Sequence, residues 1–536
     1  MTKARKLSSI AVLGGSTAAL AMLTGLAGAR ADDMQLNQQL LNQRIDQLAA
    51  VGLQPGAGAV FAIDENKAAG APVTAGSFPR SILIPGTDTS IKIYGQITEV
   101  IDYELTGGNP NSSPQTTTIG DNGQVQSIPL PGSVARARGN GIFQQSPRES
   151  KIGFETRTPT PFGEARTVFE FDWAGSTTFA PAGTSPTAIS DNLVPRLRYA
   201  YGTLGGLLAG QATSNFSDPD ANAETLDFGG NVGEPGHVRV PQIRYTMPSW
   251  WGTSFSVSAE TPQTIIATAN GLEGSDAGVI PTATTSCATA GAGSAASAAA
   301  STCTTTLLTS GVTPLNITKA AAPDLTAAWY IPQPWGHLDF SAVLRPGVVV
   351  EDGHFFSHQY IGYGGHFGAD FKPGWFGWAK DDFIVHFTIG DTIGAFLNSS
   401  TNFDLATNYG LPSTSPTTGT YGGFNGPTSA AAASLISFKP TQEMGGEIGY
   451  QHWWLDNLRS NINGGFNAHY GIPIKLVGAA QAASINKELL TGHANLIWNP
   501  VSFVDIGLEY MWGQRTVLNN TNASMQVLIS KFAFRF

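Results

Sequence analysis

The C-terminal segment, residues 526–536, alternates two kinds of side chain. Phe532, Phe534 and Phe536 fall on one face of an extended strand, while Lys531 and Arg535 fall on the other. A free edge strand with such a face would promote aggregation in water, so something apolar must cover it. Lipid can do so, because about ten alternating residues are what one tilted strand of a transmembrane β-barrel needs. The segment therefore predicts a lipid-facing strand.

Residues 1–31 have the features of a secretory signal peptide. Three basic residues precede an apolar run from Ile10 to Leu26, and Ala-Arg-Ala at residues 29–31 is a small-x-small cleavage pattern. An uncleaved N-terminal anchor is the alternative, but Gly and Thr at residues 14–17 interrupt the run. We expect the mature chain to begin at Asp32.

The composition narrows the class of protein. The chain has 536 residues with 63 Gly, 28 Phe and 11 Trp, and only 13% of its residues are charged. Beyond the leader no apolar run is long enough for a membrane-spanning helix, so apolar side chains at every second position would have to face the lipid. The net charge of −10 argues against a nucleic-acid partner.

From Ser90 onward, alternating segments are separated in turn by short and long connections. The short ones contain Gly, Pro or Asn, as turns require; they are Thr158–Gly163, Leu204–Gly206, Pro248–Gly252, Pro332–Gly336, Lys372–Phe376, Trp454–Leu458 and Asn499–Ser502. With the long loops between them they predict an all-β fold: a 16-stranded antiparallel barrel over residues 90–536. A soluble β-sandwich is the alternative. The signal peptide, the terminal Phe residues and the short-long alternation favour the barrel.

The segment before the barrel has a different pattern. Met34, Leu41 and Leu48 recur every seven residues within 32–52, which is a short heptad helix. Either several subunits form a periplasmic coiled coil there, or the helix packs alone beneath the barrel. Residues 53–89 are expected to be a linker.

Two cysteines, Cys287 and Cys303, lie in an Ala/Ser/Thr-rich tract. In an oxidising compartment they could form a disulfide; two free thiols are the alternative. Neither has further metal ligands nearby, so no metal site is expected. Because hydrolase and phosphate-loop motifs are absent from the sequence, we also expect no cofactor and no enzymatic activity.

Several motifs resemble those of the DcaP-like family of trimeric outer-membrane porins. They are Phe78–Gly95, Arg148–Pro159, Phe169–Asp172, Leu197–Gly202, Leu208–Gln211, Phe216–Asp220, Glu224–Gly229 and Pro241–Thr246. The resemblance implies a sixteen-stranded barrel in the bacterial outer membrane, a homotrimer, a periplasmic coiled coil and a preference for small anions such as dicarboxylates. This chain departs from the family in its short heptad segment and its Ala/Thr-rich connection at 261–321.

If apolar side chains face lipid, the residues between them face the lumen. Leu197, Tyr199 and Tyr201 are assigned outward, and a bulge near Pro241 is expected to set the register of Arg239. The predicted basic pore lining consists of Lys151, Arg166, Arg196, Arg198, Arg239 and Arg244. Such a lining would favour anions. Alternatively, these cations only neutralise the inward carboxylates Glu155, Glu170 and Asp172.

The connection 215–236 is the candidate constriction loop, since the resemblance implies a loop folded into the lumen at this position. Asp218, Asp220, Glu224 and Asp227 would then face the basic wall. The alternative is an acidic external loop that binds divalent cations at the cell surface.

The functional hypothesis is a porin that allows passive diffusion of small hydrophilic, preferably anionic solutes. Its expected partners are outer-membrane lipid and lipopolysaccharide, small-molecule solutes and further copies of the chain in a homotrimer. The alternative is a structural or adhesive barrel tethered to the periplasm by its N-terminal helix.

Overall fold

A computed structural model describes the greater part of the chain. The described residues are 74–109, 123–175, 194–233, 238–248, 251–268, 271–274, 284–286, 304–306, 318–351, 355–374, 379–397, 403–407, 434 and 436–536. The predicted signal peptide 1–31, the heptad segment 32–52 and the cysteines Cys287 and Cys303 lie outside them. Within these ranges, no helix has the length and apolar character needed to cross a membrane.

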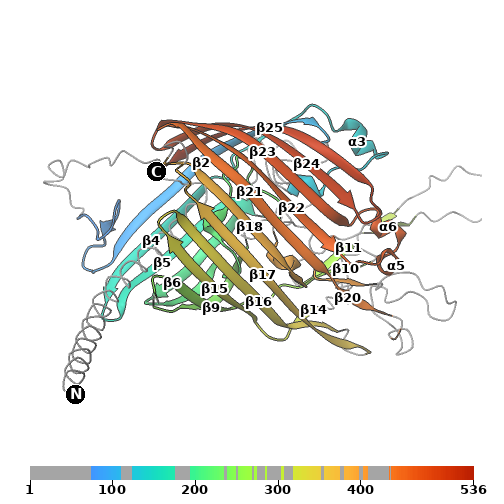
Figure 1. The fold of residues 1–536 in the computed structure, drawn as a ribbon, viewed down its shortest axis with the longest axis horizontal. Helices are drawn as coiled ribbons and strands as arrows, with labels where there is room; N and C mark the ends of the chain where they lie inside the picture. The colour runs from blue at the N-terminus through green and yellow to red at the C-terminus, as the bar shows by residue number, and fades with distance from the viewer. Residues whose placement is uncertain are drawn as a thin grey trace, which may run out of the picture.

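Sixteen antiparallel strands form a closed barrel within the described residues (Figure 1). They are β2 (Ser90–Thr106), β3 (Ile142–Ser146) continued by β4 (Lys151–Thr160), β5 (Gly163–Gly175), β6 (Val194–Leu204), β7 (Leu207–Thr213), β8 (Arg239–Thr246), β9 (Ser254–Glu260), β15 (Asp324–Gln333), β16 (Gly336–Glu351), β17 (Ser357–Phe371), β18 (Asp382–Asp391), β21 (Gln442–Leu455), β22 (Leu458–Tyr470), β23 (Asn486–Val501), β24 (Val504–Val517) and β25 (Asn522–Arg535). The predicted strand number and antiparallel order are confirmed.

The barrel closes between its first and last strands. β25 pairs with β2, with Phe534 opposite Ile97. Beyond the ladder, the backbone N–H groups of Gly95 and Phe536 each donate to the other residue's carbonyl, at 3.2 and 3.1 Å. Neither β2 nor β25 therefore keeps an open edge.

Short elements fill the connections. The helices are α2 (Gly123–Gln126), α3 (Val134–Arg138), α5 (Ile474–Val477), α6 (Ala479–Ala482), η3 (Pro219–Ala221) and η5 (Gly394–Phe396). The additional strands are β1 (Ile82–Leu83), β10 (Ile265–Thr268), β11 (Gly271–Gly274), β12 (Thr284–Ser286), β13 (Thr304–Thr306), β14 (Thr318–Ala320), β19 (Leu405–Thr407) and β20 (Phe438–Pro440). β1 pairs with β2, so the end of the expected linker is attached to the barrel.

The two faces of the strands differ as the alternation predicts. On β2, Ile93 and Ile97 are 53% and 56% exposed. Thr98, which follows Ile97 and therefore points to the opposite face, is fully buried. On β24, Leu508 is 56% exposed and Glu509 is buried. An apolar outer band over a polar interior is what a barrel needs in lipid.

One face assignment is wrong. Tyr199 and Tyr201, expected to face lipid, are buried on the inner side of β6. The ladder between β5 and β6 shifts there, because Glu170 lies opposite Tyr199 but Phe171 lies opposite Leu197. Arg198 is the extra residue of this bulge, which turns the following side chains to the other face.

The bulge expected near Pro241 is absent from β8. The ladder between β7 and β8 runs without a shift from Thr213 opposite Arg239 to Gln211 opposite Pro241. The guanidinium of Arg239 nevertheless lies on the inner side, 5.2 Å from the centre of the Tyr199 ring.

Long connections on the side of the barrel opposite the short turns pack together. β10 pairs with β19, and β19 with β20, so two connections distant in sequence share one small sheet. Beneath it, the buried Arg345 of β16 bonds Asp324 at 3.0 Å and Asp404 at 2.6 Å. Burial raises the pKa of the Asp404 carboxyl more than Arg345 lowers it. These contacts fix the connection around Asp404 to the barrel.

Candidate functional site

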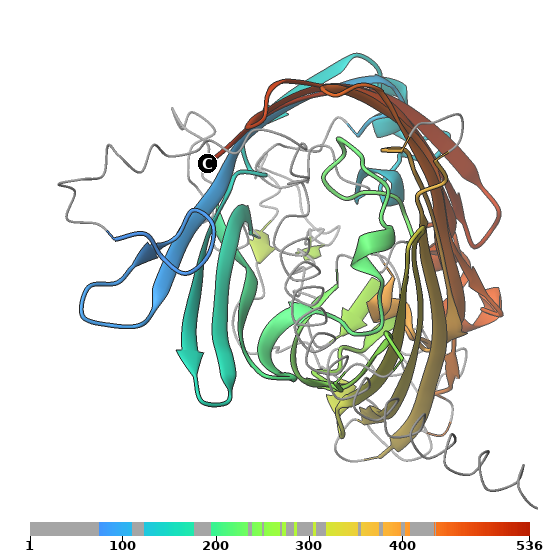
Figure 2. The ribbon, with the colours of Figure 1, turned by 60° about the vertical axis from the view of Figure 1, so that its left-hand side comes forward.

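The connection between β7 and β8 enters the barrel (Figure 2, green). Its first residues are fixed by Glu260 of β9, which accepts from Ser214 Oγ at 2.7 Å and from the Asn215 N–H at 2.8 Å. The next residue, Phe216, is completely buried. We call the described residues 214–233 the lumen loop.

Asp218 begins η3 and caps it. Its carboxylate accepts from the Asp220 N–H at 3.2 Å, a common arrangement at helix starts. The other carboxylate oxygen lies 2.7 Å from His337 Nε2 on β16. The loop therefore extends from β7 across the barrel interior to β16.

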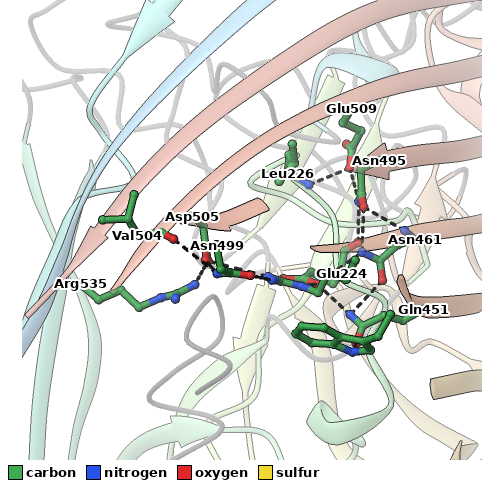
Figure 3. A network of polar contacts seen from close by, with 12 residues as sticks. Glu224, Leu226, Gln451, Asn461, Asn495, Asn499, Val504, Asp505, Glu509 and Arg535 are labelled. Carbon is green, nitrogen blue, oxygen red and sulfur yellow. Dashed lines mark hydrogen bonds and ion pairs between the residues drawn. The ribbon is translucent and has the colours of Figure 1, made fainter. Parts of the chain in front are cut away.

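The centre of the lumen loop is held by Glu224 (Figure 3). Arg459 of β22 donates to its carboxylate through Nε at 2.6 Å, and Gln451 and Asn461 donate at 2.8 and 3.3 Å. Burial raises the pKa of Glu224, but the Arg459 guanidinium outweighs it and holds the pKa below its usual value. Glu224 therefore stays ionised in a polar network.

Wall carboxylates also bind the backbone of the loop. Glu447 of β21 accepts from the Ala223 N–H at 2.6 Å. Glu509 of β24 accepts from the N–H groups of Leu226 and Asp227 at 2.8 and 3.3 Å. Charged acceptors make such bonds stronger than bonds to neutral groups.

Glycines on the inner wall allow this close approach. A Cβ at Gly465 would lie 2.6 Å from Asn231 Cβ, and one at Gly507 would lie 2.6 Å from the Leu226 side chain. A Cβ at Gly445 would similarly meet the loop backbone at 2.8 Å. Glycines on β21, β22 and β24 thus leave room for the loop against the wall.

Apolar contacts complete the docking. Leu226 and Val232 of the lumen loop join a buried cluster with Met511 and Met525 of the wall. Ile128, from the connection between β2 and β3, belongs to the same cluster. Packed side chains therefore fill the lumen beside β23, β24 and β25.

The predicted basic residues lie mainly on β4, β5 and β6, where arginines share carboxylates. Arg157 and Arg166 both bond Glu155, at 2.7 and 2.8 Å. Arg196 and Arg198 both bond Asp172, at 2.6 and 2.8 Å. We call these three strands the basic wall.

The remaining predicted cations differ in exposure. Lys151 is buried, whereas the Arg196 side chain is 40% exposed and lies 5.3 Å from the Phe228 ring of the lumen loop. Arg244 of β8 donates to Asn215 at 3.3 Å. Arg196 is thus among the most accessible of the predicted lining residues.

The predicted acidic residues of the loop lie at several places in the barrel interior. Asp218 and Glu224 pair with His337 and Arg459, on the wall opposite the basic one. Asp220 borders a cavity of about 50 Å³ between the loop and β18, β21 and β22, and Asp227 is buried.

Sequence reasoning missed the residues that receive the loop. Arg459, Glu447 and the inward glycines carry no local signal beyond their position at every second residue of a strand. Within the described residues, no three His, Cys, Asp or Glu side chains are grouped closely enough to hold a metal ion.

Comparison with known proteins agrees with the barrel geometry. Residues 82–343 match the family model described as the Porin subfamily. The outer membrane channel DcaP of Acinetobacter baumannii superposes with a TM-score of 0.57 at 20% identity, over 86% of this chain and 100% of that one. The chain has the porin fold. The predicted resemblance to DcaP-like porins is confirmed.

More distant porins also match. An anion-selective porin from Comamonas acidovorans gives a TM-score of 0.42 at 7% identity, over 84% of this chain and 100% of that one. OmpF of Salmonella typhi gives 0.42 at 9% identity, over 84% and 98%. A comparison with curated protein sequences finds no match.

Proposed function

We propose that this porin barrel conducts small hydrophilic solutes by passive diffusion, with a preference for anions. The lumen loop lies against β16 to β24, so the permeation path runs between this loop and the basic wall. Arg196 and Phe228 are in contact, with 5.3 Å between the guanidinium and the ring centre, and border this path at one side.

The arginine sharing on the basic wall carries the proposal. Glu155 and Asp172 each bind two guanidiniums. Glu164 and Glu170 bind Arg157 and Arg198 as well, so four carboxylates balance the four arginines, and Lys151 leaves the three strands with one net positive charge. In a narrow pore with low-dielectric walls, such a surplus lowers the barrier for anions.

The proposed solute class is small dicarboxylates, and the proposed assembly is a homotrimer. Both rest on the DcaP-like sequence motifs. Two guanidiniums on one strand, those of Arg196 and Arg198, supply forked donors that suit carboxylates. A carboxylate of such a solute can contact Arg196, whose side chain is 40% exposed, while the buried Arg198 contributes charge behind it.

Planar-bilayer recording tests the channel function. We expect stepwise conductance and a reversal potential of anionic sign in a salt gradient. Replacing Arg196 and Arg198 with Ser should lower the anion preference, while Lys319→Ser, in an exposed pair with Glu351, should leave it unchanged. An unchanged reversal potential in the double variant would contradict the role of the basic wall. Electrical silence of well-inserted protein would favour the structural or adhesive barrel instead.

A further inference from the structure

Four basic residues gather at the end of the barrel that carries the long connections. Arg136 and Arg138 belong to α3, between β2 and β3, while Lys487 lies at the start of β23 and Arg515 near the end of β24. Figure 1 shows α3 at the same end of the barrel as α5 and α6, away from the C-terminus. We call these four residues the rim cations.

The strand ladders bring the rim cations together. Arg515 of β24 lies opposite Ala523 of β25. The next residue of β25, Ser524, accepts a hydrogen bond from Arg136 through its carbonyl at 2.7 Å. On the other side of Arg515, Lys487 lies two residues before the position of β23 that is opposite Arg515. The rim cations therefore lie across the ends of β23, β24 and β25.

Among the described residues, the side chains of the rim cations donate to neutral groups. Lys487 Nζ donates to the side-chain oxygen of Asn520 at 2.7 Å. Arg515 donates through Nη1 to the Ile128 carbonyl at 3.0 Å, and through Nε to the side-chain oxygen of Asn486 at 2.5 Å. No described carboxylate forms an ion pair with any of the four. The basic wall differs, because carboxylates bind each of its four arginines.

The carboxylates on the same strand ends do not neutralise the rim. Glu104 of β2 is fully buried and accepts from Gln144 Nε2 at 3.0 Å. Glu488, next to Lys487 on β23, forms no ion pair within the part of the chain that the structure describes. The rim cations thus form a positive surface that lacks a bound anion.

Backbone contacts hold α3 in place at the rim. Ser133 caps the start of the helix by accepting from the Arg136 N–H at 3.1 Å. The carbonyl of Gly139, directly after the helix, accepts from the Gly108 N–H at 2.8 Å. α3 is therefore attached to the end of β2, and the exposed Arg138 side chain is carried by a fixed backbone.

The outer face of the adjoining strands is apolar. Tyr103 of β2 lies opposite Phe143 of β3 on one side and opposite Leu528 of β25 on the other. Tyr103 and Phe143 are 43% and 59% exposed. The Tyr103 hydroxyl comes close to the chain just after α3, since a Cβ at Gly141 would lie 3.5 Å from it. Aromatic rings of this kind mark the boundary between hydrocarbon and headgroups, which places α3 at headgroup level.

The rim cations do not border the proposed permeation path. The buried cluster that includes Val125, Ile128, Met511 and Met525 fills the barrel interior at β24 and β25. Arg515 contacts this filling through its bond to the Ile128 carbonyl. The rim is therefore separated from the basic wall, and its charge requires a ligand other than the permeating solute.

We propose that α3 and the adjacent strand ends bind the phosphate groups of a phosphorylated glycolipid, with its acyl chains lying on Tyr103 and Phe143. Guanidiniums suit phosphate because they donate two parallel hydrogen bonds to it. The inference requires that the barrel lies in an outer membrane with its long connections outside. It is independent of the solute preference proposed above.

Native mass spectrometry of the full-length protein, titrated with bisphosphorylated lipid A, tests the site. The double variant Arg136→Gln, Arg138→Gln should bind about 25-fold more weakly, since each cation at a membrane surface contributes about fivefold. Arg138→Gln alone should lose about fivefold and, at an exposed side chain, leave the fold unchanged. The control Lys319→Gln, Lys380→Gln removes two exposed lysines and should bind like the parent. Equal affinities of the parent and the double variant would overturn the inference.

Further measurements separate a lipid from free phosphate and from a protein partner. Phe143→Ala should weaken lipid A binding several-fold, whereas Phe255→Ala, on the outer face of β9, should not. Inorganic phosphate that binds as tightly as lipid A, or parent affinity in Phe143→Ala, would contradict a lipid site. Variants that dissociate a multimer at unchanged lipid affinity would show an interface between copies and also overturn it.

Bilayer recording distinguishes this inference from the proposed function. All of these variants should keep the parent conductance, because none of the replaced side chains borders the proposed path. Loss of lipid A binding with normal conductance supports the site, and parent affinity in the double variant with normal conductance refutes the site alone. A parent protein that binds lipid A but conducts no current would refute only the channel function.

Discussion

Glu224 and Arg459 lie 235 residues apart in sequence and form one ion pair across the barrel interior. The Arg459 guanidinium also lies 3.8 Å from Asp505 of β24, and 5.3 Å from the ring of Trp453. One buried cation thus joins the lumen loop to two strands of the wall. The centre of the loop depends on this pair more than on any regular backbone pairing, because 222–233 contain no helix or strand.

Arg459→Met should destabilise the docked loop. The change keeps the length of the side chain but leaves Glu224 without its cation, which costs about 2 kcal/mol of docking free energy. We expect frequent partial closures in single-channel records at neutral pH. Lys319→Met, which removes an exposed pair with Glu351, is the control. Records of Arg459→Met that match the parent would exclude this role for the pair.

Strong acid should release the loop through Glu224. The pKa of this group is lowered in the folded protein, so its contribution is present above the ordinary value of 4.5. That contribution is lost as the pH falls further, through the lowered pKa. Conductance titrated below about pH 4.5 should show a transition that Glu224→Gln lacks. A transition that persists in Glu224→Gln would assign it to another group.

Gly465→Ala should displace the loop by steric contact. The new methyl group meets Asn231 and the Val232 carbonyl, and overpacking of this kind costs about 1–3 kcal/mol. We expect a lower thermal unfolding temperature and a reduced conductance. At Gly492, an added Cβ would meet nothing closer than 3.9 Å, so Gly492→Ala should behave like the parent. Equal effects of the two substitutions would argue against tight loop packing.

Leu508→Arg tests the lipid face of the barrel. Leu508 is an exposed residue in the middle of β24, where an arginine in hydrocarbon costs about 2–4 kcal/mol. The denaturant midpoint of the protein in bilayers should fall accordingly. Thr106→Arg, at the end of β2, should cost less than about 1 kcal/mol. A similar loss for both would place Leu508 outside the lipid band.

Sequence periodicity predicted the strands because each strand must separate lipid from polar interior at every second residue. Ile506 to Trp512 and the terminal Phe residues follow this rule without interruption, and their orientation is as expected. The rule failed at Tyr199. A bulge at Arg198 reverses which side of the barrel the following side chains point to. Because tyrosine occurs on both the lipid side and the lumen side, the sequence alone does not reveal this reversal.

The contacts of the lumen loop with the barrel wall could not be predicted from strand periodicity. An acidic loop suggested contact with the basic wall, but Glu224 instead pairs with a single arginine on β22. That choice depends on glycines and carboxylates supplied by strands far away in sequence, such as Gly465 and Glu509. Their role becomes visible only when the barrel brings them to one surface.

The pairing of β25 with β2 also sets the order of events during biogenesis. The two strands come from opposite ends of the barrel sequence, so every other hairpin can form before this seam does. Until then the chain has two open edges that can pair with other chains, and it needs protection on its way to the membrane. The barrel is closed once Phe536 pairs with Gly95. From that moment the interior of the barrel is separated from the surrounding lipid.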